Sequence, residues 1–277
     1  MVTGIIYVWY YDTLYFAPSY NSVASNGQKQ DKSIMNRNLL DALPDPQGMD
    51  FDALLCWVNA RVEAIRQTAF TPDLQNTFAC VTLDTLPEHP LGVEALASWR
   101  KFFLATLVAD WVSYGRPSDR ADFSRLKYIM SSAYRTTRLW GCRLADGSFA
   151  PVGYTTWYPI AQFVFEGVLR HQVDLNDRGI FAPLRFADLD KVDYAYVFNI
   201  SLVEGLINTP CSKKPILELI RDGVRHPETN VLAVTVAEQG RKFSDIMGFE
   251  QAGEITVQGE KELLFVRRAE RAHKTKL

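Results

Sequence analysis

The strongest hydrophobic pattern lies in the last third of the chain and predicts two strands joined through a helix. In Val192–Val203 large apolar side chains alternate with smaller or polar ones, and Asn230–Val236 is almost continuously apolar and β-branched. These are the patterns of a half-buried strand and of a strand covered on both faces. Between them, Pro215–His226 has the one-sided apolar pattern of a helix. This order predicts a βαβ unit with a right-handed crossover and a parallel strand pair.

The chain continues with a short helix and two closing strands. Gly240–Phe249 carries an apolar stripe and contains Gly248 where a helix commonly leaves through the left-handed region. Glu250–Val257 and Glu262–Arg267 then have the pattern of two strands joined by a turn.

The middle of the chain predicts helices and a hairpin. The expected helices span Asp50–Gln67, Val93–Tyr114 and Asp119–Ala133, and the expected first strand spans Phe78–Leu83. Thr136–Leu144 and Phe149–Trp157 flank Asp146 and Gly147, and Asp-Gly between two strand-like runs is a strong hairpin signal. The mixed pattern of Pro159–Asp190 predicts no particular element.

The N-terminal part differs from the rest in composition. Gly4–Phe16 is rich in Tyr and Trp and predicts a strand pair packed on the body of the protein, while Pro18–Met49 is polar and predicts a long loop or linker. We therefore expect an N-terminal extension over residues 1–75, with a strand pair, a linker and one helix, followed by the main domain over residues 76–277.

Composition and charge narrow the functional classes. The chain has 277 residues, of which 47% are hydrophobic and 22% charged, and its net charge is −2. This predicts a soluble globular protein without a long nucleic-acid footprint, and the apolar start is too short to span a membrane. The four cysteines lie far apart without metal-ligand spacing, which predicts no metal site and reduced thiols in a cytoplasmic protein.

Two segments in this order resemble the GNAT (GCN5-related N-acetyltransferase) superfamily. Arg241–Glu250 is similar to the helix that ends in Gly-Phe in that family, and Ala150–Trp157 is similar to its third strand, where a Val-Gly pair commonly sits. The resemblance covers about Asn76–Arg268. It implies an α/β fold with a mixed, mostly antiparallel sheet that is flanked by helices and splayed between two central parallel strands.

The resemblance also implies a donor and a reaction. The pantetheine arm of acyl-CoA would enter the splay like an extra strand, and an acyl group, most simply acetyl from acetyl-CoA, would pass to a primary amine of a small molecule or peptide by direct attack in a ternary complex. Free amides and a helix dipole favour an anion such as pyrophosphate at the loop after the first strand. The cofactor-binding residues that the resemblance implies are Leu202, Val203, Thr209, Cys211, Ser212, Lys213 and Lys214, with backbone N–H groups near Leu202 and Val203 as oxyanion donors.

The catalytic candidates lie near the same strand. Glu204, at the mouth of the splay, is the preferred base and would act through water, while Asp193 and Tyr196 are further candidates. Ser244 occupies the position where many members of the family have a Tyr that protonates the departing thiolate. Cys211 is also the candidate nucleophile for an alternative covalent mechanism, since a helix start lowers a thiol pKa.

Departures from the family pattern leave two alternatives open. The glycines of the usual phosphate loop are absent, and Pro210 and Pro215 each remove an amide donor. One alternative is a non-catalytic GNAT-like binding or scaffold protein. The other is an acyltransferase that takes its acyl group from acyl carrier protein, because Pro151–Trp157 resembles a segment of the toxin-activating lysine acyltransferases. The sequence also leaves a homodimer open.

Overall fold

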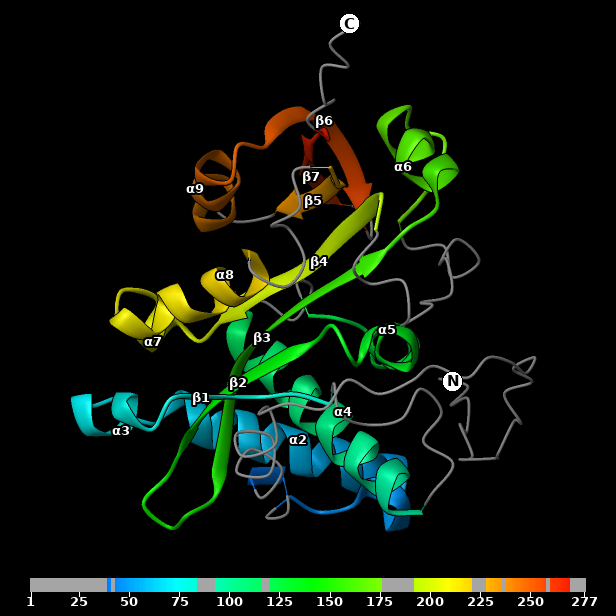
Figure 1. Cartoon of the computed structure of the whole chain (residues 1–277). Coiled ribbons are helices and arrows are strands. Elements are labelled where there is room, and N and C mark those ends of the chain that lie inside the picture. The colour runs from blue at the N-terminus through cyan, green and yellow to red at the C-terminus, as the bar shows by residue number, and fades with distance from the viewer. Residues whose placement is uncertain are drawn as a thin grey trace, which may run out of the picture.

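The computed structural model describes residues 39–40, 43–83, 93–115, 120–175, 192–220, 228–235, 238–257 and 260–269. These residues form a sheet of seven strands in the order β1-β2-β3-β4-β5-β7-β6 (Figure 1). The strands are β1 Ala79–Val81, β2 Arg138–Arg143, β3 Phe149–Pro159, β4 Tyr194–Leu202, β5 Asn230–Thr235, β6 Glu250–Val257 and β7 Glu260–Arg267. Every neighbouring pair is antiparallel except β4 and β5, which are parallel.

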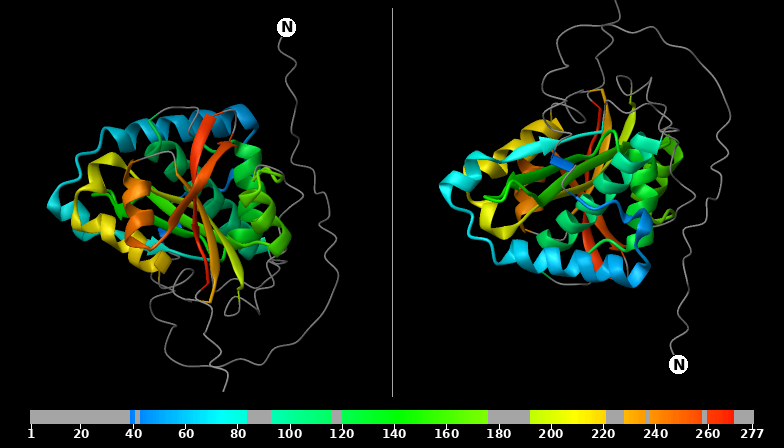
Figure 2. Two further views of the ribbon diagram at one scale, coloured as in Figure 1. Left: turned by 90° about the horizontal axis from the view of Figure 1, so that it is seen from above. Right: turned by 90° about the horizontal axis from the view of Figure 1, so that it is seen from below.

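Helices cover both faces of the sheet. They are α2 Phe51–Arg66, α3 Pro72–Asn76, α4 Val93–Ser113, α5 Phe123–Ala133, α6 Gln162–Leu169, α7 Glu204–Ile207, α8 Lys213–Leu219 and α9 Glu238–Ile246, with 3-10 turns η1 Pro46–Gly48 and η5 Pro210–Ser212. Side chains of α5 and α6 share one core cluster with β4 and β5, and side chains of α8 and α9 share another. Figure 2 shows α8 and α9 on one side of the sheet and α6 on the other.

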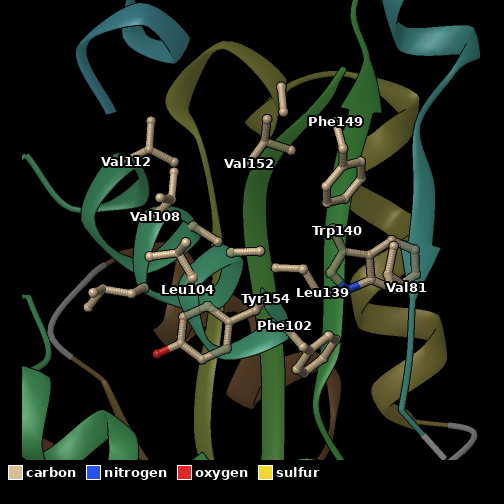
Figure 3. Packing of buried hydrophobic residues seen from close by; sticks show 14 of the residues in the cluster. Val81, Phe102, Leu104, Val108, Val112, Leu139, Trp140, Phe149, Val152 and Tyr154 are labelled. Carbon is tan, nitrogen blue, oxygen red and sulfur yellow. The ribbon is translucent and has the colours of Figure 1, made fainter. Parts of the chain in front are cut away.

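The largest core cluster is built around α4. This helix is apolar on nearly all sides, because it packs between α2 and the sheet, and a helix of that kind is buried. Phe102, Leu104 and Val108 of α4 are fully buried and face Val152 and Tyr154 of β3 (Figure 3). The cluster therefore ties the first helices to the half of the sheet that contains β1, β2 and β3.

The predicted fold class is confirmed, and so are the predicted strands of the sheet and the parallel pair. The helix predicted to begin at Pro215 begins at Lys213, because proline is tolerated in the first turn, where its missing N–H has no partner to bond. The loop predicted after β4 contains α7 and η5. Helix α6 lies in the segment for which the sequence predicted no element. The strand pair expected at residues 4–16 lies outside the described residues, as does most of the predicted linker.

Helix α2 belongs to the same core as the sheet. Leu54, Val58 and Ile65 are buried in the cluster that contains α4 and β3. Arg61 donates a hydrogen bond to the carbonyl of Phe149 at 2.9 Å, which fixes α2 against the hairpin of β2 and β3. The boundary at residue 75 stays a prediction, and in the structure α2 packs into the core that contains α4 and β3.

A buried acid joins α4 to the sheet. Asp110 of α4 accepts hydrogen bonds from the Tyr154 hydroxyl at 2.7 Å and from the Ala121 N–H at 2.8 Å. Burial raises the pKa of Asp110 to about 6, although these two hydrogen bonds and the guanidinium groups of Arg120 and Arg125 oppose the rise. The carboxyl group is therefore a pH-sensitive part of the contact between α4 and β3.

Among the described residues, no helix has both the length and the apolar character needed to cross a membrane. Within the same ranges, no group of three or more His, Cys, Asp and Glu side chains is arranged to hold a metal ion.

Replacing Ile65 with Ala should destabilise the whole domain. The side chain is 1% exposed, and truncating a buried Ile typically lowers the free energy of unfolding by about 2–5 kcal/mol. Urea unfolding followed by tryptophan fluorescence should show one transition at a lower midpoint, because α2 shares its core with α4. Asn59→Ala, on the exposed side of α2, is the control. An unchanged midpoint for Ile65→Ala would show that α2 is not part of the cooperative core.

Stability should fall as the pH rises through the titration of Asp110. Below about pH 4 the carboxyl is neutral in both the folded and the unfolded state. Between pH 4 and 6 the unfolded chain loses the proton first, because its pKa is 3.8 and that of the folded protein is about 6. This difference corresponds to about 3 kcal/mol of unfolding free energy lost by pH 7.

The matched variant for this prediction is Asp110→Asn, which cannot ionise. Urea titrations at pH 4, 5, 6 and 7 should show the variant gaining stability relative to the parent protein over this range. Curves of unfolding free energy against pH that run parallel for the two proteins would contradict the assignment.

Candidate active site

The two central parallel strands separate before they end. Pairing between β4 and β5 runs from Tyr194 opposite Asn230 to Val197 opposite Ala233, and no pair follows. Strand β4 continues to Leu202. Residues 199–202 therefore have a strand partner on the β3 side but none on the β5 side, and this open side of β4 is the wedge that the resemblance predicted (Figure 1).

A bulge in β4 lies where the separation begins. The register with β3 passes from Val197 opposite Trp157 to Asn199 opposite Thr156, so Phe198 is an extra residue in β4. A bulge bends its strand and increases the local twist, which turns the rest of β4 away from β5. The guanidinium of Arg125 lies 5.4 Å from the centroid of the Phe198 ring on the side of α5.

Backbone groups of β4 face the wedge beyond the bulge. The N–H of Val203 donates to the carbonyl of Val152 at 2.7 Å, so this amide is used in pairing with β3. Successive residues of a strand direct their N–H and C=O groups to opposite sides. The N–H and C=O groups of Ile200 and Leu202 consequently point toward the side where β5 is absent, and of the two predicted oxyanion donors it is Leu202 that can reach a ligand there.

Gly153 allows β3 to approach this part of β4 closely. It lies opposite Leu202, and a Cβ atom added to it would lie 2.2 Å from the carbonyl oxygen of Ser201. Any larger residue would push the strands apart. The Val-Gly pair noted in the sequence therefore has a structural function beside the wedge.

A network of polar side chains lies on the α4 side of the same strand. The Tyr114 hydroxyl, at the end of α4, donates to Oδ1 of Asn199 at 2.6 Å. Nδ2 of Asn199 donates to the carbonyl of Tyr154 at 3.0 Å and to Oγ of Ser201 at 2.8 Å. Asn199 and Ser201 are 6% and 8% exposed, so two nearly buried polar side chains lie on the part of β4 that has no partner in β5.

The amides of the predicted phosphate loop are largely bonded within the loop. The N–H of Thr209 donates to the carbonyl of Leu206, that of Cys211 to Oγ1 of Thr209, and that of Ser212 to the carbonyl of Thr209. Oγ of Ser212 donates to the same Thr209 carbonyl at 2.8 Å and makes no capping hydrogen bond to α8. These three residues close a turn and leave few donors for an anion.

The other predicted loop residues have separate environments. Nζ of Lys214 donates to the carbonyl of Phe78 at 3.4 Å and lies 5.4 Å from the centroid of the Phe78 ring, so this lysine is attached to the edge of the sheet. Lys213 is exposed, and its ammonium group has no partner among the described residues. The thiol of Cys211 donates to the carbonyl of Gln75 at 3.6 Å, and the residue is 3% exposed.

Of the predicted catalytic residues, the structure brings only Glu204 to the wedge within the described part of the chain. Glu204 begins α7 directly after β4 and is exposed. Its carboxylate has no hydrogen-bond or ion-pair partner in the described residues. Asp193 is exposed at the opposite end of β4, about 30 Å away at about 3.3 Å per residue.

The two remaining candidates are buried. Tyr196 is 4% exposed and packs against Tyr158 and Phe198, and burial raises the pKa of Tyr196 to about 12. Ser244 is 2% exposed, and its hydroxyl donates to the carbonyl of Gly240 one turn earlier in α9 at 3.0 Å. Both side chains therefore belong to the core, and the Ser244 hydroxyl is bonded within its own helix.

Tyr114, Asn199 and Ser201 were not predicted as site residues. The signal available in the sequence was the presence of Asn and Ser inside the otherwise apolar run of β4. Their common side could not be derived from it, because the bulge at Phe198 shifts the alternation of the strand by one residue.

Comparisons with known proteins give matches among solved structures alone. No family model matches the sequence, and no curated protein matches it. The chain is similar to a chain of the NatC complex bound to Gag peptide and CoA, with 11% identity and a TM-score of 0.43 over 69% of this chain and 98% of that one.

Two further solved structures have similar values of sequence identity and TM-score. A GphF GNAT-like decarboxylase in complex with isobutyryl-CoA is 13% identical with a TM-score of 0.42, over 61% of this chain and 95% of that one. NAA60 of Arabidopsis thaliana in complex with acetyl-CoA is 12% identical with a TM-score of 0.41, over 69% of this chain and 99% of that one. The chain's own sheet is mostly antiparallel with a short parallel β4–β5 pair, as the resemblance to the GNAT fold implied.

Proposed function

We propose that the protein is an N-acyltransferase that moves an acyl group, most simply acetyl, from acyl-CoA to a primary amine. The observation that carries this proposal is the open side of β4, where the strand continues to Leu202 after its pairing with β5 has ended at Val197. The amine would attack the thioester directly while both substrates are bound.

The open side of β4 suits the pantetheine arm of acyl-CoA. An extended ligand adds to an exposed strand edge through main-chain hydrogen bonds. Pantetheine is extended and contains two amide groups, which can pair with the N–H and C=O groups of Ile200 and Leu202. An arm held in this way would bring the thioester to the end of β4, beside Glu204.

The reaction needs a neutral amine, a donor for the oxyanion and an acceptor for one proton. The amine nitrogen attacks the carbonyl carbon, a C–N bond forms, and the N–H of Leu202 stabilises the negative charge on the oxygen. Glu204 accepts the amine proton through water. When the carbonyl re-forms, the C–S bond breaks and the thiolate leaves and takes a proton from water.

The phosphate end of the donor would be held by charge more than by amides. The Thr209, Cys211 and Ser212 amides are bonded within their own turn, and Lys213 keeps an exposed ammonium group. This arrangement favours a second candidate donor, acyl carrier protein, whose phosphopantetheine carries one phosphate and needs no pyrophosphate seat.

Isothermal titration with acetyl-CoA, CoA and acetyl-phosphopantetheine tests the donor. We expect CoA and acetyl-CoA to bind, and Lys213→Ala to weaken both. Binding of the phosphopantetheine as tight as that of CoA, without an effect of Lys213→Ala, would favour acyl carrier protein. Absence of binding of all three at millimolar concentration by folded protein would contradict the proposed function.

Glu204→Gln should lower kcat for transfer to an amine by about 10²–10⁴-fold, because the proton acceptor is lost. Affinity for CoA should stay within about twofold, since the carboxylate does not contact the pantetheine arm in this proposal. Turnover is measured by thiol release across a panel of primary amines. Glu250→Gln, an exposed carboxylate at the start of β6, is the control. Equal activity of the two variants would eliminate Glu204 as the base.

A further inference from the structure

We propose that Ser201 is a catalytic residue of the acyl transfer, whose hydroxyl donates, together with the N–H of Leu202, to the oxygen of the tetrahedral intermediate. The proposal rests on the proposed function and adds to it a side chain that the sequence did not indicate. It depends on the direction of the hydrogen bonds that run from Tyr114 through Asn199 to Ser201.

The carbonyl of Tyr154 fixes the orientation of the Asn199 amide. A backbone carbonyl can only accept, so the group of Asn199 that lies 3.0 Å from it must be the NH₂ group. The same NH₂ group then donates its second hydrogen to Oγ of Ser201 at 2.8 Å. Oδ1 of Asn199 faces the other way and accepts from the Tyr114 hydroxyl at 2.6 Å.

The hydroxyl hydrogen of Ser201 is left to donate elsewhere. Its oxygen already accepts from Asn199, and no acceptor for its hydrogen lies among the described residues. Other buried hydroxyls bond to backbone carbonyls, as Thr106 does to the carbonyl of Phe102 at 2.8 Å, whereas Oγ1 of Thr155 has no partner among the described residues. A nearly buried hydroxyl with an unused donor is expected to have a partner, and the partner here would be a bound substrate.

The network also strengthens this donor. Each member donates in the same direction, from Tyr114 to Asn199 and from Asn199 to Ser201, and hydrogen bonds in such a chain polarise one another. The rigid contact with the Tyr154 carbonyl holds the chain in place on the sheet. Ser201 is therefore oriented before a substrate arrives, as an oxyanion donor must be.

The proposal assigns the donors of Ser201 and Leu202, two consecutive residues of β4, to one acceptor atom. The side chain of Ser201 projects from the sheet on the α4 side, and the N–H of Leu202 points in the plane of the sheet toward the wedge. In this proposal the oxyanion lies at the edge of β4 and accepts from both donors, each at ordinary hydrogen-bond distance. Ser201 keeps its proton throughout the reaction, so the proton and electron balance of the transfer is unchanged.

The test is Ser201→Ala, measured for kcat and for CoA affinity. We expect kcat to fall by about 10²–10³-fold, the typical effect of losing one oxyanion donor, while the Kd for CoA stays within about twofold. Ser201→Thr, which keeps a hydroxyl, should recover part of the activity. Thr106→Val removes a buried hydroxyl that is bonded within α4, and it serves as the matched control for any effect on stability.

Tyr114→Phe separates a positioning effect from a structural one. It should lower kcat by about three- to tenfold, as expected for the loss of one neutral hydrogen bond, without a change in CoA affinity. If Ser201→Ala does not fold, this variant decides the question, and an unchanged kcat overturns the proposal.

Two other outcomes overturn it as well. The first is a Ser201→Ala protein with the kcat of the parent. The second is a loss of activity that is matched by an equal loss of CoA affinity, which would make Ser201 a binding or structural residue. Failure of the parent protein to bind acyl donors would instead refute the proposed function, and the two failures are therefore distinguishable.

Discussion

One extra residue in β4 is the constraint on which the candidate site depends. Phe198 interrupts the pairing of β4 with β3, and the pairing of β4 with β5 ends at the residue before it. Without the bulge, the two parallel strands could continue side by side to Thr235, and the backbone groups of Ile200 would be used within the sheet. The local bend replaces those internal hydrogen bonds with an open edge that an extended ligand can occupy.

An open strand edge inside a sheet is stable only if its other contacts hold it. Strand β4 remains paired with β3 as far as Val203, and Gly153 allows the two backbones to approach closely. Strand β3 is in turn fixed to α4 by the buried pair of Asp110 and Tyr154. The core around α4 therefore supports the strand that β5 leaves unpaired, and the site lies on a rigid element.

The periodic part of this architecture could be predicted from the sequence, and the irregular part could not. The alternation in β4, the continuous apolar run of β5 and the Asp-Gly turn before β3 each predicted an element that the structure contains. Helix α6 escaped prediction because it has eight residues, with Val164, Phe165 and Val168 buried and Phe163 exposed, a pattern too short to show a period. The wedge was predicted through the family resemblance, since no local pattern indicates where two strands separate.

Among the site residues, too, positions that follow from a regular strand could be predicted, and positions that depend on the bulge could not. The position of Glu204 could be predicted, because it depends only on where β4 ends, while its catalytic role stays a prediction. Asn199 and Ser201 required knowledge of the side of the sheet on which they lie. Before the bulge, Ala195 and Val197 face α8 and α9, whereas after it Ile200 packs on that side. The odd-numbered positions thus change sides at Phe198, and Asn199 and Ser201 meet Tyr114 on the side of α4. A polar network can assemble at the wedge because the same irregularity opens the sheet and redirects the side chains.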